Sequence, residues 1–301
     1  MRIGVFFPTK EHAPLDETVA RMVDVAGHGF SAVWLPQSSG FDALTLLALV
    51  GRETSGVELG TSVVPTYPRH PIALAAQALT VNAATGSRLV LGIGLSHRVT
   101  VEGTYGLSYD RPARHMQEYL AVLAPLLREQ TVDVDGETIS AHARLSVPGA
   151  TAPTLLLAAL QPRMLALAGG VGDGTITWCT GPVTLERQVV PLLRAAASDA
   201  GRPDPRVVVA LPTIVTDDEA HGRAAAGEQL AGYGDLPVYR AVLDAEGADG
   251  PADVSVVGDE AAVIAHLERL RAVGATDFIA IPTGTDADRR RTLDHLASLV
   301  G

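Results

Sequence analysis

The sequence is poor in cysteine, lysine and aromatic residues. Its 301 residues include one cysteine, Cys179, one lysine, Lys10, and 4% aromatic residues. A single cysteine excludes an intrachain disulfide, so the sequence gives no sign of secretion. The N-terminus runs directly into an apolar strand pattern without a charged leader. No apolar run approaches the roughly 20 residues of a membrane span. We therefore expect a cytoplasmic protein with no membrane partner.

The formal net charge is −11, and charges of both signs are mixed along the chain. This composition argues against a nucleic-acid partner. The one basic cluster, Arg289 to Arg291, is typical of a solvated helix face. The nine histidines show no metal-binding spacing, so we expect no metal site. Neither a GxSxG elbow nor a Walker A loop is present, which weakens hydrolase and kinase interpretations.

Eight short apolar runs alternate with helical periodicities, as parallel strands covered on both faces require. This pattern predicts an α/β protein with a (β/α)₈ TIM barrel as a single domain over 1–301, with an open doubly wound sheet as the alternative. The runs are Ile3–Phe7, Ala32–Leu35, Val57–Val64, Arg88–Ile93, Thr154–Ala159, Gly174–Trp178, Val207–Ile214 and Asp277–Ile281.

Two spacings are too long for simple loops and predict insertions at about 130–153 and 218–257. Asp135-Gly136 between apolar residues indicates a hairpin in the first, and the second has helical character. We expect both at the C-terminal face of the strands, where barrels often build substrate pockets.

The most informative motif is Gly94-Leu95-Ser96-His97, which follows the fourth apolar run. Glycine permits close approach of a ligand, and exposed N–H groups can hold a phosphate. His97 stands where a dinucleotide fingerprint needs glycine, so that fingerprint fails. His97 is either a functional side chain or a surface histidine at a turn.

Three other strand ends carry candidate residues. Thr61 and Ser62 can face a ligand or merely satisfy the barrel rim. Gln161 and the segment Trp178-Cys179-Thr180-Gly181 precede predicted helices, whose N-termini attract anions. Together with Leu95 and Ser96 they can hold one phosphate, or they can simply cap helices. Cys179 has no basic neighbour or partner cysteine, which disfavours a nucleophile or metal ligand.

With these residues in place, the chain resembles the luciferase-like monooxygenase superfamily, and most closely its branch that uses the deazaflavin coenzyme F420. The resemblance covers nearly the whole chain. Its carriers are Leu59–Val63, Arg69–Pro71, Arg88–Gly94, Pro162–Met164, Gly172–Gly174 and Gly274–Phe278.

The resemblance implies F420, with FMN as the alternative cofactor, lying across the C-terminal ends of the strands. A non-proline cis peptide at Ser62–Val63 would back its ring. The phosphate would lie among Leu95, Ser96, Gln161, Cys179, Thr180 and Gly181. Gln37 and Ser38, which we expect to contact the cofactor, replace the Asp-His pair of related sugar-phosphate dehydrogenases, and His97 replaces an acidic residue. Gln37 can still hydrogen-bond the polar edge of the ring. These departures argue against sugar-phosphate oxidation.

The resulting hypothesis is hydride transfer between F420 and a small organic substrate, with the protein acting as a reductase and His97 as proton donor. The substrate would lie between the ring, His97 and the 218–257 insertion, with Trp34, Tyr105 and Tyr109 as possible lining residues. An FMN-dependent monooxygenase is the first alternative, and a non-catalytic cofactor-binding protein is the second. A barrel lyase is disfavoured because it needs a strand-end lysine. The family usually forms homodimers, so we expect one here.

Overall fold

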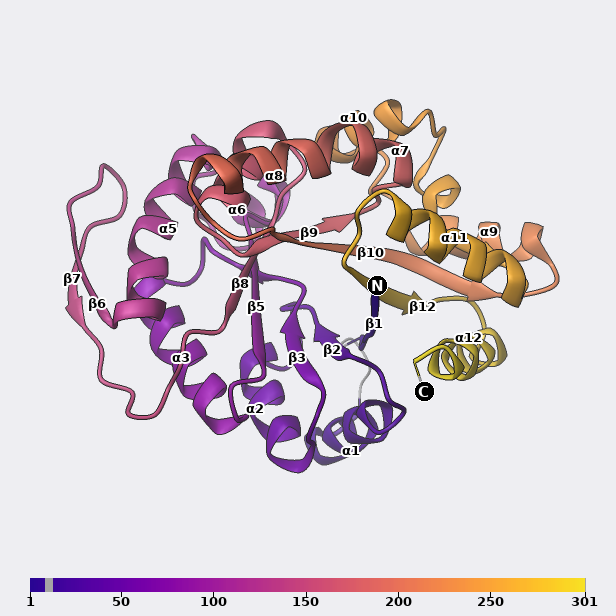
Figure 1. The fold of residues 1–301 in the computed structure, drawn as a ribbon, viewed down its shortest axis with the longest axis horizontal. Helices are drawn as coiled ribbons and strands as arrows, with labels where there is room; N and C mark the ends of the chain where they lie inside the picture. Colours follow the sequence, from indigo (N-terminus) through magenta and orange to yellow (C-terminus); the bar gives the residue numbers. More distant parts are fainter. Residues whose placement is uncertain (9–12, 301) are drawn as a thin grey trace.

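Eight parallel strands close into a barrel in this computed structural model, which describes residues 1–8 and 13–300 and leaves Lys10 outside the described residues. The last strand pairs with the first, so the predicted (β/α)₈ barrel is confirmed and the open sheet is wrong (Figure 1). The barrel strands, in spatial order, are β1 (Arg2–Phe6), β2 (Ala32–Leu35), β3 (Glu58–Thr61), β5 (Leu89–Gly94), β8 (Thr154–Ala158), β9 (Gly174–Trp178), β10 (Arg206–Val215) and β12 (Asp277–Pro282).

Helices cover the outside of the barrel, as Figure 1 shows. No described helix is both long enough and apolar enough to cross a membrane. The outer helices are α1 (Leu15–Ala26), α2 (Ala43–Glu53), α3 (Pro71–Ala84), α5 (Pro112–Glu129), α6 (Pro162–Gly170), α8 (Val190–Asp199), α11 (Glu260–Ala272) and α12 (Asp286–Ser298). Shorter segments at the strand ends are α4 (Arg98–Gly103) and α7 (Pro182–Thr184), and α7 continues through one π-helical stretch (Leu185–Val189) into α8.

The barrel interior is filled by side chains rather than left as a channel. Trp34 is the largest of them and is 1% exposed. Its ring fits because neighbouring strands carry glycine: a Cβ on Gly4 would lie 2.7 Å from the indole Nε1, and a Cβ on Gly60 would clash with the ring. Trp34 is therefore a core residue and does not line a substrate site.

An ion-pair network joins the N-terminal ends of four strands. Asp277 is 5% exposed and accepts hydrogen bonds from Arg2 Nε at 2.8 Å and Arg206 Nη2 at 2.6 Å. Both arginines also reach Glu58, at 2.9 and 3.1 Å. The network therefore connects β1, β12, β10 and β3 where the barrel closes.

The predicted strand 57–64 is wrong as one continuous element. It is divided into β3, which ends at Thr61, and the two-residue β4 (Val64–Pro65). The Thr61 hydroxyl donates to the Gly92 carbonyl at 2.8 Å and accepts from the Gly92 N–H at 2.9 Å. A side chain thus bridges to β5 at the point where β3 breaks away, and Ser62 and Val63 form the irregular step between the two pieces.

The two predicted insertions lie at different ends of the barrel. Residues 130–153 contain the hairpin of β6 (Thr131–Val134) and β7 (Ala141–Arg144), which Figure 1 shows outside α5. This hairpin follows a helix and leads to the start of β8, so our expectation that it lies at the C-terminal face is wrong. Residues 218–257 do follow the C-terminal end of β10, and hold α9 (Glu219–Gln229), α10 (Pro237–Glu246), a 3₁₀ turn (Pro251–Val254) and β11 (Val256–Gly258).

Candidate active site

The predicted phosphate loops follow three adjacent strands, β5, β8 and β9. Ser96 and Cys179 both have left-handed backbones, with φ of 60° and 53°. Non-glycine residues rarely adopt this conformation, and it directs successive N–H groups into one concavity. Several backbone N–H groups of these loops donate to no other described residue, among them those of Leu95, Ser96, His97, Gln161, Cys179, Thr180 and Gly181. The three loops therefore present a set of free donors.

The step between β3 and β4 lies against the first of these loops. The Ser62–Val63 peptide bond is cis, as the family resemblance implied. A Cβ on Gly94 would lie 2.8 Å from Val63 Cγ2 and 3.1 Å from the Ala158 Cβ, so glycine is what allows Val63 to approach β5. The Ser62 hydroxyl has no hydrogen-bond partner among the described residues. Ser62, Val63 and Gly94 thus form one continuous surface at the barrel mouth.

Two predicted cofactor contacts have their side chains engaged elsewhere. The Thr61 hydroxyl is committed to Gly92 and is fully buried. The Gln37 carbonyl oxygen accepts from Ala43 N at 3.0 Å and Arg69 Nη2 at 3.1 Å, while its amide donates to the Ser38 carbonyl. Gln37 therefore anchors the start of α2, and its side chain is not free to bond the edge of a ring. Its backbone N–H donates to Val63 O at 3.3 Å, which supports the step between β3 and β4.

His97 lies beneath the 218–257 insertion. Its carbonyl starts α4, while its imidazole makes no hydrogen bond to any described residue. Two rings of the insertion pack edge-on against it, Tyr239 at 5.7 Å and Tyr233 at 6.3 Å between centroids. Burial lowers the pKa of His97 below its ordinary value of 6.5, because an imidazolium is poorly solvated there. His97 is therefore a neutral imidazole near pH 7, with both ring nitrogens available to a ligand.

A second group of aromatic side chains, which the sequence did not predict, lies beside Ser96. Tyr67 stacks on His115 with 3.9 Å between centroids and 6° between planes, and on Tyr109 at 5.3 Å. The Tyr109 hydroxyl donates to the Ser96 carbonyl at 3.2 Å, which helps to fix the phosphate loop. The Tyr67 hydroxyl is buried without a partner, and burial raises the pKa of Tyr67 to about 12. Only the position of Tyr67 just after the broken strand could have suggested it.

Other candidates take structural roles. His70 accepts from Ile72 N and caps α3. Cys179 is fully buried, and burial raises the pKa of its thiol to about 12, which removes a nucleophilic role. Tyr105 is 38% exposed and contacts none of the rings around His97. Over residues 1–8 and 13–300, no three histidine, cysteine or acidic side chains are grouped to hold a metal.

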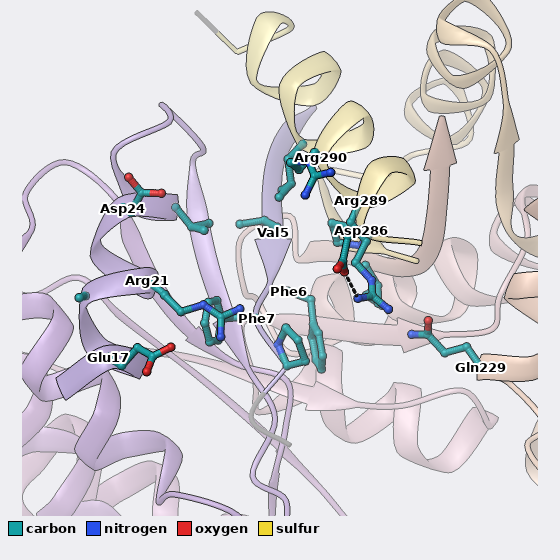
Figure 2. Close-up of a pocket in the computed structure, with 16 residues that line it drawn as sticks. Val5, Phe6, Phe7, Glu17, Arg21, Asp24, Gln229, Asp286, Arg289 and Arg290 are labelled. Atoms are coloured by element: carbon teal, nitrogen blue, oxygen red, sulfur yellow. Dashed lines mark hydrogen bonds and ion pairs between the residues drawn. The ribbon is translucent and has the colours of Figure 1, made fainter. Parts of the chain in front are cut away.

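A cavity of about 960 Å³ opens on the opposite side of the barrel mouth, between α1 and α12. Figure 2 shows Phe6 and Phe7 at its centre, Arg21 on one side, and Arg289 paired with Asp286 on the other. The cavity also touches Gln229 at the end of α9. Phe6 and Ile281 line it; Ile281 belongs to an interior cluster against which Phe6, Val63 and Trp178 also pack. The cavity therefore lies next to the same cluster of interior side chains as the step between β3 and β4.

Comparison with known proteins agrees with this geometry. Residues 1–297 match the family described as luciferase-like monooxygenase. The chain belongs to the luciferase-like monooxygenase family. It is 29% identical over 273 residues to a putative coenzyme F420-dependent oxidoreductase of Mycobacterium tuberculosis, which covers 82% of this chain and 73% of the relative.

Two solved structures share the fold of this luciferase-like protein. The F420-dependent tetrahydromethanopterin reductase of Methanopyrus kandleri superposes with a TM-score of 0.82 at 20% identity, over 98% of this chain and 97% of that one. An oxygenating component of a Pseudomonas putida Baeyer–Villiger monooxygenase, in complex with FMN, gives 0.78 at 15% identity, over 100% and 97%. The chain is thus an oxidoreductase of the flavin- or F420-dependent luciferase-like type.

The residues at the mouth fit a ring that carries a phosphate. The Trp178 indole N–H, like the Tyr67 hydroxyl, is buried without a hydrogen-bond partner, and a buried donor left unpaired is costly. Trp178 ends β9 directly before the loop with free N–H groups. The unpaired donors can bind the polar edge of the ring, and the apolar step at Val63 can lie against its face. The free N–H groups of the loops can bind the phosphate.

Proposed function

We propose that this luciferase-like protein is an F420-dependent oxidoreductase that exchanges a hydride between the deazaflavin and a small organic substrate. The observation that carries the proposal is the pair of left-handed residues, Ser96 after β5 and Cys179 after β9, in loops whose backbone N–H groups have no partner among the described residues. The relative of Mycobacterium tuberculosis described as a putative coenzyme F420-dependent oxidoreductase supports this choice of cofactor over FMN.

Each part of the site has a share in holding the cofactor. Ser62 and Val63 would lie behind the ring, with Gly94 leaving room for Val63. The phosphate would accept hydrogen bonds from the free N–H groups of the three loops. Trp178 and Tyr67 would donate to polar atoms of the cofactor or substrate. F420, when bound, supplies or accepts the hydride.

His97 would move the proton that accompanies the hydride. When a carbonyl carbon gains a hydride, its oxygen gains one proton, and the His97 imidazolium would donate it. In the opposite direction the neutral imidazole would accept the proton of an alcohol. Because burial favours the neutral form, His97 suits alcohol oxidation at pH 7 at least as well as carbonyl reduction. The proposal therefore includes alcohol oxidation as well as the reductase reaction expected from the sequence.

The substrate would enter through the cavity of Figure 2. Its floor is apolar, with Ile281 in the cluster against which Phe6 and Val63 also pack. A compact, largely apolar alcohol or carbonyl compound fits such a floor. The aromatic rings of Tyr233 and Tyr239 would close the other side over His97 and exclude water.

The test is a pair of fluorescence titrations with F420 and FMN, followed by turnover assays on alcohols and ketones. We expect micromolar or tighter binding of F420 and a change in deazaflavin absorbance with at least one substrate. Tight FMN binding without F420 binding would replace the proposal with an FMN-dependent monooxygenase. F420 binding without absorbance change across the panel would favour a cofactor-binding protein without turnover. Light scattering of the purified protein would test the expected homodimer in the same preparation.

A further inference from the structure

The carboxylate of Glu246, the last residue of α10, is bound at the N-terminus of the helix that follows β9. It accepts hydrogen bonds from Thr184 N at 2.7 Å and Val183 N at 3.1 Å. The Thr184 hydroxyl donates to the Val242 carbonyl, which fixes α10 to the same helix. An acidic side chain from the insertion thus takes two N–H groups directly after the proposed phosphate loop.

The Glu246 carboxylate also lies close to the proposed phosphate loop. A Cβ on Gly181 would lie 2.9 Å from Glu246 Cγ and would clash with the carboxyl group. The carboxylate therefore lies against Gly181, the last residue of the phosphate loop. A phosphate bound by Cys179, Thr180 and Gly181 would be a direct neighbour of Glu246.

This carboxylate forms no ion pair with any described residue, and the two backbone N–H groups are its hydrogen-bond donors. Glu246 acts electrostatically on His266 of α11, whose pKa is nonetheless lowered by burial together with Arg269 and Arg223. His266 is therefore neutral near pH 7. Cys179, two residues before Gly181, and Tyr233 and Tyr239 of the insertion are neutral too, because burial raises the pKa of each.

From this geometry we infer that Glu246 selects the cofactor by the charge of its phosphate, favouring a phosphodiester over a phosphomonoester. The inference rests on the proposed function, because it assumes a phosphate in the loops around Gly181. The diester of F420 carries one negative charge there, whereas the monoester of FMN carries about −1.5 to −2 at pH 7. A fixed carboxylate repels each unit of charge on the phosphate, by roughly tenfold in affinity per full unit at this range, so it disfavours the monoester more than the diester.

The test compares dissociation constants of matched ligands for the wild-type protein and two variants. The ligands are FMN with riboflavin, and F420 with its deazaflavin alcohol, which lacks the phosphate and tail. Glu246→Gln removes the charge and keeps an acceptor oxygen for the helix. Asp244→Asn removes one charge from the same helix, where Asp244 pairs with Arg240 at the surface, and serves as the control.

We expect Glu246→Gln to strengthen F420 binding roughly tenfold, to strengthen FMN binding about 30- to 100-fold, and to leave the two uncharged ligands unchanged. Asp244→Asn should alter none of these ratios. Equal changes for FMN and F420, a change for riboflavin as large as for FMN, or the same result with Asp244→Asn would overturn the inference. If the wild-type protein binds none of the four ligands, the proposed function fails and the inference with it.

A measurement on the wild-type protein needs no variant. Phosphomonoesters gain their second charge near pH 6, and the diester does not titrate there. FMN affinity relative to riboflavin should therefore fall between pH 5.5 and 7.5, while the F420 to deazaflavin-alcohol ratio stays constant. A rise in the FMN ratio over this range, as a site with only N–H donors would give, would contradict the role of Glu246 even if Glu246→Gln fails to fold.

Discussion

The imidazole of His97 meets the ring of Tyr239 edge-on, with 5.7 Å between the centroids and 62° between the planes. The two residues are 142 positions apart, and the contact exists because the 218–257 insertion folds back over the end of β5. It gives His97 an apolar environment, and neither ring nitrogen has a hydrogen-bond partner among residues 1–8 and 13–300. The chemistry of this histidine is therefore set by the insertion as much as by its own loop.

The pH dependence of turnover should follow the lowered pKa of His97. Carbonyl reduction needs the imidazolium, so its kcat/KM should fall as pH rises through a value below 6.5. Alcohol oxidation needs the neutral form, so its rate should rise through the same value and remain level above it. Replacing His97 by Gln should lower both rates about 10²-fold or more and remove this titration. Unchanged rates and profiles in the variant would exclude the proton-transfer role.

Tyr239 should control that pKa through its ring. Tyr239→Ala admits water beside the imidazole, so the midpoint of the pH profile should move up toward 6.5. Tyr239→Phe keeps the ring and should leave the midpoint where it is. Both variants need a thermal melt first, because truncation of a buried aromatic side chain costs about 3 kcal/mol or more. A shift with Phe, or none with a folded Ala variant, would show that the ring is not the cause.

Gly94→Ala should weaken cofactor binding through Val63. The new methyl group would lie 2.8 Å from Val63 Cγ2, so the step between β3 and β4 would have to move. We expect the F420 dissociation constant to rise about tenfold or more, which is the effect of roughly 1.4 kcal/mol. Adding Val63→Ala removes the colliding methyl and should recover part of the loss, measured as a double-mutant cycle. Independent, additive effects would show that the two residues do not meet as described.

The strand periodicity was sufficient to predict the barrel, because buried parallel strands are short, continuous apolar runs. It could not locate the break after Thr61, since the sequence there remains apolar and the break depends on the Thr61 side chain bonding to Gly92 on another strand. Helix α2 buries six of its eleven residues at helical spacing, as an outer helix of a barrel does.

The strand-end loops of the candidate site could be found from glycine and hydroxyl residues next to predicted strands. The contacts between them could not. Gln37 was assigned to the cofactor because nothing local shows that Arg69 and Ala43 use its oxygen. Tyr239 and Glu246 were missed for the same reason: both act across the gap between the insertion and the barrel, and only the fold brings them there.

The attachment of the β6–β7 hairpin should depend on the charge of Glu118. Although burial alone would raise it, hydrogen bonds from the Thr138 hydroxyl and from the Thr138 and Ile139 N–H groups lower the pKa of Glu118 to about 2, below its ordinary 4.5. A lowered carboxyl pKa stabilises the fold above pH 4.5, and this stabilisation is lost as pH falls toward 2.

Glu118→Gln should therefore lower the free energy of unfolding by about 2 kcal/mol at pH 7, as expected for hydrogen bonds to a charged group. The difference from wild type should shrink as pH falls from 4.5 toward 2. Urea titrations at several pH values measure it, with exposed Glu137→Gln as the control. A difference that stays constant with pH would mean that shape, not charge, holds the hairpin.

Barrel closure should depend on Asp277. Its carboxylate is buried and accepts from both Arg2 and Arg206, and an amide has only one oxygen and cannot balance two guanidinium groups. Asp277→Asn should lower the free energy of unfolding by about 3 kcal/mol, because it leaves buried positive charge without its partner. Glu58→Gln removes the more exposed acid of the same network and should cost no more than about 1 kcal/mol. If both variants lose the same free energy of unfolding in urea denaturation, Glu58 and Asp277 contribute equally, and Asp277 is not the main link between β12 and its neighbours β1 and β10.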